Sequence, residues 1–454
     1  MMRGLLLISS AGGHDPAAER ETVRGRLLLL FRSIGRGRPL VHSDANGPAG
    51  VTSRRPAADT LDMTSSSSPR CRKGLAVLAA AVCAAGATGL APAYASDVRE
   101  PAADAPWVVS LGDSFISGEA GRWAGNSNES EDGWSRTDRA YDPETDESDP
   151  KRVYGASYDS GCNRSDVAEV QSLTLAVRKL NLACSGATST AVKLPEHGGE
   201  PFKGEPSQAG RLQQAVTGQQ VRAVVVSIGG NDLGFSDIIT DCTKQFLKPF
   251  GGSPCAPDAG QQVKERLPGV RTAVVETLAD VRTALERSGH AAGSYRLVLQ
   301  SYPSPLPDAG RVRYPGEKYD RFTQGGCPFY DRDLTWAHDD LVPQISATLA
   351  EAAHEAGAEF LDLSRAFEGR EVCSTTTRHA DLAHPPSGKT SEWMRFLTTG
   401  AGQGQLQESL HPDRYGQQAL GTCLSLQLEQ PTADRRCLNT PGRGPAAMEL
   451  AAIG

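Results

Sequence analysis

The feature that most constrains the fold is the run VRAVVVSI at residues 221–228, in which only Arg222 and Ser227 are polar. A run this short, apolar and rich in valine favours a β-strand whose two faces are both buried. We therefore predict a five-stranded parallel sheet with helices on both faces. The other four strands are predicted at short apolar runs, residues 107–111, 180–183, 296–300 and 359–363.

Segments with helical spacing of apolar residues separate these runs. The longest covers residues 262–287, where apolar side chains recur every three or four positions, and Pro268 either kinks this helix or marks its true start. Strands alternating with helices are typical of one α/β domain, which we place at residues 96–437. Further helices are predicted at residues 165–179, 206–217, 334–356 (interrupted near Pro343) and 412–426.

Two segments of the chain lack either pattern. Residues 122–159 are acidic and rich in Gly, Asn, Ser and Pro, so we interpret them as a surface insertion. Residues 438–454 are rich in Gly, Pro and Ala and are predicted to form a flexible C-terminal tail. A calcium site is conceivable in the insertion, but a solvated acidic loop is the favoured interpretation of Asp142, Glu144, Asp146, Glu147 and Asp149.

The first 95 residues have the organisation of a leader rather than of a folded domain. Residues 63–95 combine a basic start, an apolar Ala-rich stretch and the small-x-small sequence Ala93-Tyr94-Ala95, as in a signal peptide. We expect cleavage before Ser96, a secreted extracellular protein and no stable membrane anchor. Residues 1–62 are interpreted as a spurious or disordered extension.

The charge balance of the remaining chain limits its partners. Residues 96–454 carry 35 Lys and Arg against 48 Asp and Glu, a net charge of −13. Such a surface disfavours binding to nucleic acid or to an anionic membrane. We expect a soluble monomer.

The cysteine count agrees with export. Eight cysteines follow residue 95, and an even set in an exported chain indicates disulfides. Eight cysteines allow 105 pairings, among which we favour the pairing of sequence neighbours. The predicted bridges are Cys162–Cys184, Cys242–Cys255, Cys327–Cys373 and Cys423–Cys437.

Polar residues flanked by glycine follow three of the predicted strands, at residues 112–114, 185–187 and 230–232. The carboxyl ends of parallel strands are where α/β sheets collect ligands. Ser114 offers a hydroxyl nucleophile, His411 a base, and Glu408 a carboxylate to orient that base. Candidate donors to an oxyanion are the backbone N–H groups of Ser114 and Gly186 and the side-chain amide of Asn231.

These residues lie in four blocks that resemble the SGNH hydrolases, the GDSL-type lipases and esterases, and in particular the secreted actinobacterial branch. The blocks are LGDSFISGEAG (111–121), LACSGATS (182–189), GGND (229–232) and HPDRYGQQAL (411–420). The resemblance spans about residues 107–423 and implies a flavodoxin-like three-layer αβα sandwich. It also implies a serine ester hydrolase that needs no metal or cofactor, with a small-molecule or lipid ester as substrate.

Two departures from the family pattern leave alternatives open. The family usually has Asp three residues before the histidine, where this chain has Glu408, and some relatives orient the histidine with a backbone carbonyl instead. In addition, Asp381-Leu382-Ala383-His384-Pro385 matches the literal Asp-x-x-His-Pro pattern better than residues 408–412 do. We favour His411 because Gly416 and a predicted helix follow it, and Glu408 as a triad acid ahead of a bystander.

Each of these features also has a structural interpretation. Ser114 could cap a helix, Asn231 could close an Asx turn, and Gly186 could be a turn residue beside a disulfide. Four such blocks in order make an active site the better hypothesis. The rival function is a non-catalytic secreted binding protein of the same fold, and among enzymes a carbohydrate or polyester esterase is the alternative to a lipase.

Overall fold

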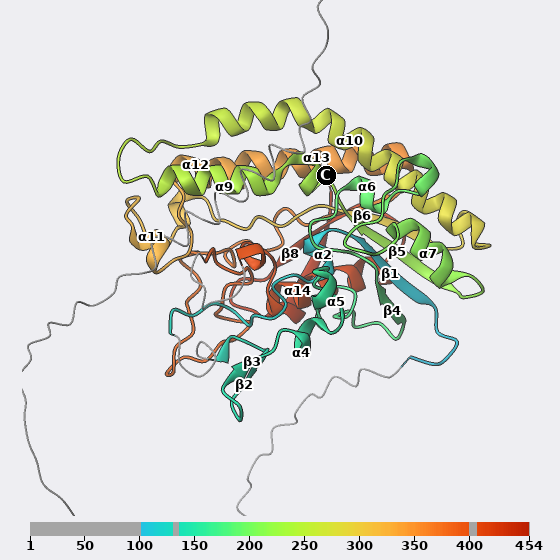
Figure 1. Cartoon of the computed structure of the whole chain (residues 1–454), viewed down its shortest axis with the longest axis horizontal. Coiled ribbons are helices and arrows are strands. Elements are labelled where there is room, and N and C mark those ends of the chain that lie inside the picture. The colour runs from blue at the N-terminus through green and yellow to red at the C-terminus, as the bar shows by residue number, and fades with distance from the viewer. Residues whose placement is uncertain (1–100, 130–135, 399–405, 454) are drawn as a thin grey trace, which may run out of the picture. The chain divides into compact units, whose positions relative to one another are not determined.

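The computed structural model of the protein describes residues 101–129, 136–398 and 406–453. Its central element is a seven-stranded sheet in the order β4-β1-β5-β6-β7-β8-β9 (Figure 1). Neighbouring strands are parallel except for β8 and β9. The strands are β1 (Trp107–Gly112), β4 (Arg178–Asn181), β5 (Val221–Ser227), β6 (Arg296–Gln300), β7 (Glu359–Asp362), β8 (Arg435–Asn439) and β9 (Met448–Ala452).

The first five of these strands form the flavodoxin-like core that the sequence predicts. β4, the second strand of this sheet along the chain, pairs with one edge of β1, while β5, β6 and β7 follow on the other edge of β1. β5 is buried at every residue except Arg222, as expected for a central parallel strand with both faces covered. The carboxyl ends of β1, β4 and β5 therefore lie side by side.

Helices cover the sheet on both sides. α10 (Ala256–Arg287) packs against α13 (Val342–Ala356) and α7 (Gln208–Val216), and α10 and α13 lie together on one side (Figure 1). α14 (Arg414–Glu429) lies on the other side. The other α-helices in the described part of the chain are α2 (Ser114–Ser117), α4 (Lys151–Tyr154), α5 (Ser157–Ser160), α6 (Ser189–Val192), α8 (Gly230–Leu233), α9 (Phe235–Phe246), α11 (Asp320–Thr323) and α12 (Asp331–Trp336).

The two prolines that marked doubtful helix boundaries have different outcomes. Pro268 lies inside α10, which begins at Ala256 and continues through it. The interruption predicted near Pro343 is a π-helical turn, η3 (Ala337–Leu341), which joins α12 to α13. Pro343 itself is the second residue of α13, directly after this π-helical turn.

The helix predicted at residues 165–179 is wrong, because most of this segment is made of turns and its end belongs to β4. Side chains of α14 bind its backbone in place of helical partners: Glu169 N donates to Gln417 Oε1 (2.8 Å) and Thr174 N donates to Ser425 Oγ (3.0 Å). A Cβ on Gly421 would lie 2.7 Å from the Cβ of Ser172, so α14 packs directly on the segment. Tertiary contact outweighs the local apolar spacing here.

The surface insertion predicted at residues 122–159 is partly buried. Trp123 and Asn126 are fully buried, and the Arg122 guanidinium binds the buried Asp138 carboxylate, with Nε 2.7 Å from Oδ1. The insertion also carries the short hairpin of β2 (Tyr141–Asp142) and β3 (Glu147–Ser148). The acidic residues named above lie on or beside this hairpin with exposed or half-exposed side chains, and none belongs to a metal-binding group among the described residues.

The C-terminal tail is not loosely ordered as predicted. β8 extends the parallel sheet beside β7, and β9 folds back antiparallel on β8. The Cys423–Cys437 disulfide joins α14 to β8, so this edge is tied to the helix before it. The sheet consequently has seven strands instead of the predicted five.

The structure confirms all four predicted disulfides: Cys162–Cys184, Cys242–Cys255, Cys327–Cys373 and Cys423–Cys437. The predicted signal peptide at 63–95 and the extension at 1–62 lie outside the described residues. Within the described residues, no helix is both long enough and apolar enough to cross a membrane.

Candidate active site

Ser114 is the first residue of α2 and lies two residues after Gly112, the last residue of β1. The turn between β1 and α2 requires glycine at position 112. Gly112 has φ of +135°, and a Cβ there would lie 1.9 Å from the Ser227 carbonyl oxygen. Asp113 stabilises the turn, since its Oδ1 accepts from Phe115 N (3.1 Å) and its Oδ2 from the Tyr302 hydroxyl (2.6 Å). Burial raises the pKa of Asp113 to about 7.

His411 lies against Ser114, with Nε2 2.7 Å from the serine Oγ. Its other ring nitrogen, Nδ1, lies 2.9 Å from the backbone carbonyl oxygen of Ser409. A carbonyl oxygen can only accept a hydrogen bond, so Nδ1 must carry the proton. Nε2 is then the unprotonated nitrogen, and it can accept the proton of the Ser114 hydroxyl.

Glu408 does not orient His411, contrary to the triad arrangement favoured from the sequence. It is buried, and its Oε2 accepts from Trp123 Nε1 and its Oε1 from the Tyr154 hydroxyl, both at 2.8 Å. Both donors come from the insertion at residues 122–159. The guanidinium of Arg395 lies 3.5 Å from the centre of the Trp123 ring. Glu408 thus connects the insertion to the segment that carries His411.

The oxyanion candidates gather at the ends of β4 and β5. Gly186 has φ of +80°, and the Cys162–Cys184 disulfide fixes the chain just before it. The Asn231 side-chain amide donates to the Ala187 carbonyl oxygen (2.9 Å), which places it beside Gly186 and leaves its second N–H for another acceptor. Cys184 N donates to the Gly112 carbonyl oxygen (3.0 Å), which joins this loop to the turn that carries Ser114.

Lys203 holds the Ser185–Gly186 peptide from behind. Its Nζ donates to the carbonyl oxygens of Ser185 (2.7 Å) and Gly161 (2.6 Å). The carbonyl of Ser185 and the N–H of Gly186 belong to the same peptide unit. A cation on that carbonyl fixes the peptide plane and polarises the N–H of Gly186 toward the opposite side.

A family model supports the significance of this geometry. The model of the GDSL-like Lipase/Acylhydrolase family matches residues 110–419, which include the strand ends and His411 described above. The chain belongs to this family of ester hydrolases.

Three proteins that are similar to this GDSL-like protein come from Streptomyces. A protein named esterase from Streptomyces scabiei is 27% identical over 196 residues, 38% of this chain and 53% of that protein, so the match spans about half of the relative's length. Among solved structures, an extracellular lipase from Streptomyces rimosus is 20% identical with a TM-score of 0.37, covering 71% of this chain and 99% of the lipase. Phospholipase A1 from Streptomyces albidoflavus NA297 is 19% identical with a TM-score of 0.42, covering 72% and 100%.

The competing motif around His384 lies apart from the serine. His384 Nδ1 is 2.9 Å from Asp381 Oδ1, and the side chains are 49% and 39% exposed. The pair therefore has the literal Asp-x-x-His-Pro arrangement on the protein surface. Ser114 Oγ is at His411 instead.

The structure has the alternative left open from the sequence, a backbone carbonyl beside His411 Nδ1, and this carbonyl belongs to Ser409. One residue close to His411 was not singled out from the sequence. Glu119 is part of the first block, and its Oε2 lies 3.8 Å from His411 Nε2. Burial raises the pKa of Glu119. Its place in a conspicuous motif, five residues after Ser114, was the available signal.

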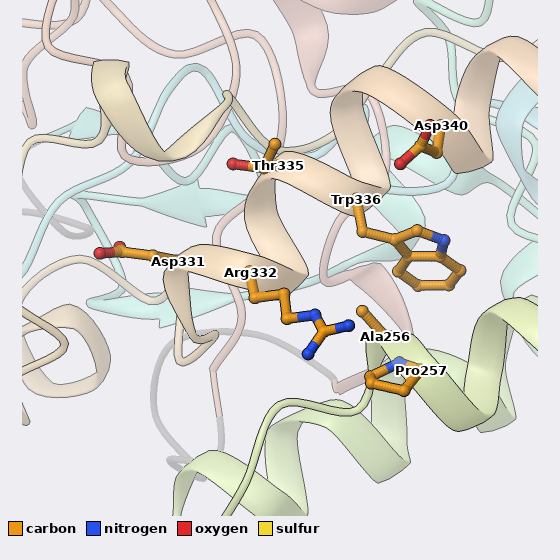
Figure 2. A pocket seen from close by; sticks show the side chains of 7 residues that line it. All are labelled: Ala256, Pro257, Asp331, Arg332, Thr335, Trp336 and Asp340. Carbon is orange, nitrogen blue, oxygen red and sulfur yellow. The ribbon is translucent and has the colours of Figure 1, made fainter.

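Other clusters in the described residues are separate from this site. Cys242 and Cys255 near Asp333 form a disulfide and so offer no thiolate to a metal. His338 lies near Glu368 and Glu371, but Arg311 and Arg365 donate to its Nε2 at 3.3 and 3.2 Å, so guanidinium groups already neutralise this cluster. A pocket between α10 and α12 is lined by Ala256, Pro257, Asp331, Arg332, Thr335, Trp336 and Asp340 (Figure 2).

Proposed function

We propose that this chain is a secreted serine ester hydrolase that works through an acyl-enzyme on Ser114. The observation that carries the proposal is the 2.7 Å contact between Ser114 Oγ and His411 Nε2, with Nδ1 held by the Ser409 carbonyl. A neutral histidine in this tautomer is a general base aimed at the serine proton. Membership of the GDSL-like family supports an ester as the bond that is attacked.

The proposed reaction begins when Ser114 Oγ attacks the ester carbonyl carbon and its proton passes to His411 Nε2. The carbonyl electron pair moves onto oxygen, and the N–H groups of Ser114 and Gly186 and the Asn231 amide bind this oxyanion. Collapse of the intermediate expels the alcohol, which takes the proton from His411. Water, deprotonated by His411, then releases the acid and regenerates Ser114.

Secretion rests on two supports. The four disulfides suit an oxidising compartment, and residues 63–95 have the pattern of a signal peptide. If the proposal is right, protein recovered from the culture medium of an actinobacterial host starts at Ser96. Full-length protein retained in the cells would contradict it.

The substrate is proposed to be a small-molecule or lipid ester, with carbohydrate and polyester esters as the alternative classes. Hydrolysis of p-nitrophenyl butyrate by the wild type and by Ser114→Ala tests the chemistry. The variant should lose activity by at least about 10³-fold, because no covalent intermediate can form, and should melt at the wild-type temperature. Unchanged turnover in Ser114→Ala would contradict the proposal, whereas an absence of turnover in the wild type would favour a non-catalytic binding function.

A further inference from the structure

The hydrogen-bond partner of His411 Nδ1 carries no negative charge to stabilise the imidazolium that forms in the proposed mechanism. When His411 takes the Ser114 proton, the ring becomes a cation in a partly buried site. In a Ser-His-Asp triad, the carboxylate on Nδ1 stabilises that imidazolium. Here the partner is the Ser409 carbonyl, which orients the ring but carries no net charge.

A carboxylate is present on the opposite side of the ring. Glu119 follows the short helix α2, where Gly118 (φ +92°) turns the chain back and Glu119 N donates to the Ser114 carbonyl oxygen (3.2 Å). The Glu119 side chain is 3% exposed, and its Oε2 lies 3.8 Å from His411 Nε2. This separation is too long for a hydrogen bond but short for attraction between opposite charges in a site with little water.

The Glu119 carboxylate is held at that position by buried polar groups. Its Oε1 accepts from Asn163 Nδ2 at 2.9 Å. Asn163 is buried and follows Cys162, whose disulfide to Cys184 fixes the local chain. Because its other oxygen is anchored, Oε2 cannot turn away from the histidine without breaking a buried hydrogen bond.

We propose that Glu119 is a positioning residue for ester hydrolysis, whose carboxylate stabilises the His411 imidazolium from its Nε2 side. The inference rests on the function proposed above. The proton still moves from Ser114 Oγ to His411 Nε2, and Glu119 neither gains nor loses one. The neutral Ser409 carbonyl orients the base, while Glu119 provides the charge. The two tasks that one triad acid combines are thus divided between two groups.

The charged and titratable groups around Glu119 define when it can act. Burial raises its pKa, and the nearby carboxylate of Glu408 raises it further, whereas His411 and the hydrogen bonds from Asn163 and Ser185 lower it. Lys203, Asp113 and Tyr154 also interact electrostatically with Glu119. Glu119 must be ionised to act, so its protonation contributes to the loss of activity at low pH.

The test is Glu119→Gln, which keeps an acceptor for Asn163 and removes the charge. With p-nitrophenyl butyrate, kcat should fall by on the order of 10- to 100-fold, with KM within about twofold, because the lost interaction forms only when the imidazolium forms. The low-pH limb of kcat/KM should move to lower pH and become less steep, since one of two required deprotonations is gone. Counting competent sites by the p-nitrophenol burst corrects for any misfolded fraction.

Two further variants separate electrostatics from packing. Glu119→Asp keeps the charge, and its kcat should be at least about tenfold higher than that of Glu119→Gln. Glu371→Gln is the matched control, because Glu371 is equally buried and its Oε1 lies 3.9 Å from the Nε2 of a different histidine, His338. That control should leave kcat and the pH profile unchanged.

The outcomes distinguish this inference from the function on which it rests. A kcat for Glu119→Gln within about threefold of wild type, or a low-pH limb that does not move, would overturn the role of Glu119 alone. Equal losses in Glu119→Gln and Glu119→Asp would also overturn it, by showing that Glu119 matters only for packing. Retained activity in Ser114→Ala would instead overturn the proposed function.

Discussion

The chain has two His-Pro segments, at His384 and at His411, and each has one of the two histidine contacts that a catalytic triad combines. His384 has a carboxylate partner, Asp381, at 2.9 Å from Nδ1, but half of its side chain is exposed to solvent. His411 has the Ser114 hydroxyl at 2.7 Å from Nε2, but its Nδ1 partner is the Ser409 carbonyl. The comparison teaches that a position near the carboxyl end of β1, and not the literal Asp-x-x-His-Pro pattern, decides which histidine contacts the serine.

The two segments also differ in how firmly they are held. Residues 408–413 form a buried network: Leu410 N donates to the Arg395 carbonyl (2.7 Å), and Arg395 N donates to the His411 carbonyl (2.9 Å). Glu408 and Asp413 close the two ends of this network. Around His384, the turn is closed by Asp381 and by the Glu129 carboxylate, which accepts from Leu382 N (3.2 Å), in a segment whose side chains are largely exposed.

Replacing each histidine by alanine should give the largest contrast. His411→Ala removes the proposed base, so kcat should fall by about 10³-fold or more. His384→Ala touches only an exposed ion pair and should leave kcat within about twofold. Hydrolysis of p-nitrophenyl butyrate by both purified variants measures the contrast. Full loss of activity in His384→Ala alone would reverse the assignment.

Removing the charge of the acid three residues before each histidine should give the next contrast. Glu408→Gln leaves buried donors from Trp123 and Tyr154 with a poorer acceptor, so unfolding should become easier by about 2–4 kcal/mol. Its kcat per folded molecule should stay within about tenfold, whereas removing a triad acid costs about 10⁴-fold.

Asp381→Asn is the matched control for Glu408→Gln. Its solvent-exposed pair with His384 should contribute little to the free energy of unfolding. Urea denaturation and active-site titration give both quantities. A Glu408→Gln enzyme with wild-type stability and no turnover would restore Glu408 as the triad acid.

Asp413, two residues after His411, should give a smaller effect that depends on pH. It caps α14, and its oxygens accept from the backbone N–H groups of Gly125, Tyr415 and Gly416. Asp413→Asn loses one acceptor oxygen and should destabilise the fold by about 1–2 kcal/mol.

The pH dependence of that loss has a defined sign. Burial raises the pKa of Asp413 to about 7 in the fold. The stability gained from its protonated form is therefore fully present below the unfolded pKa of about 4 and is lost as pH rises through 7. The gap in unfolding free energy between wild type and Asp413→Asn should accordingly shrink from pH 5 to pH 8. A gap that widens over this range would contradict the assigned direction.

Much of the frame was predictable because the signals are local. A β-branched run such as residues 221–228 is buried on both faces only in a sheet that is covered on both sides. The glycine at position 112, which the structure shows at a φ of +135°, marks the turn before Ser114. The disulfides were also predictable, because each links cysteines that are neighbours in the sequence.

The rest depends on contacts between distant residues. Residues 165–179 have helical spacing, yet side chains of α14, about 250 positions away, bind their backbone instead. β8 (RRCLN) carries two arginines and β9 (MELAA) is rich in alanine, and neither contains a β-branched residue, so their composition does not indicate strands. The role of Glu408 could not be predicted because its donor Trp123 lies 285 residues earlier in the chain.

Labelling with a fluorophosphonate, followed by peptide mass spectrometry, tests the central claim most directly, because this reagent reacts only with an activated serine. The account predicts one label, on Ser114, at equal rates in wild type, His384→Ala and Asp381→Asn, and at least about 10²-fold slower labelling in His411→Ala. Labelling of another residue, or of Ser114 at the wild-type rate without His411, would contradict it.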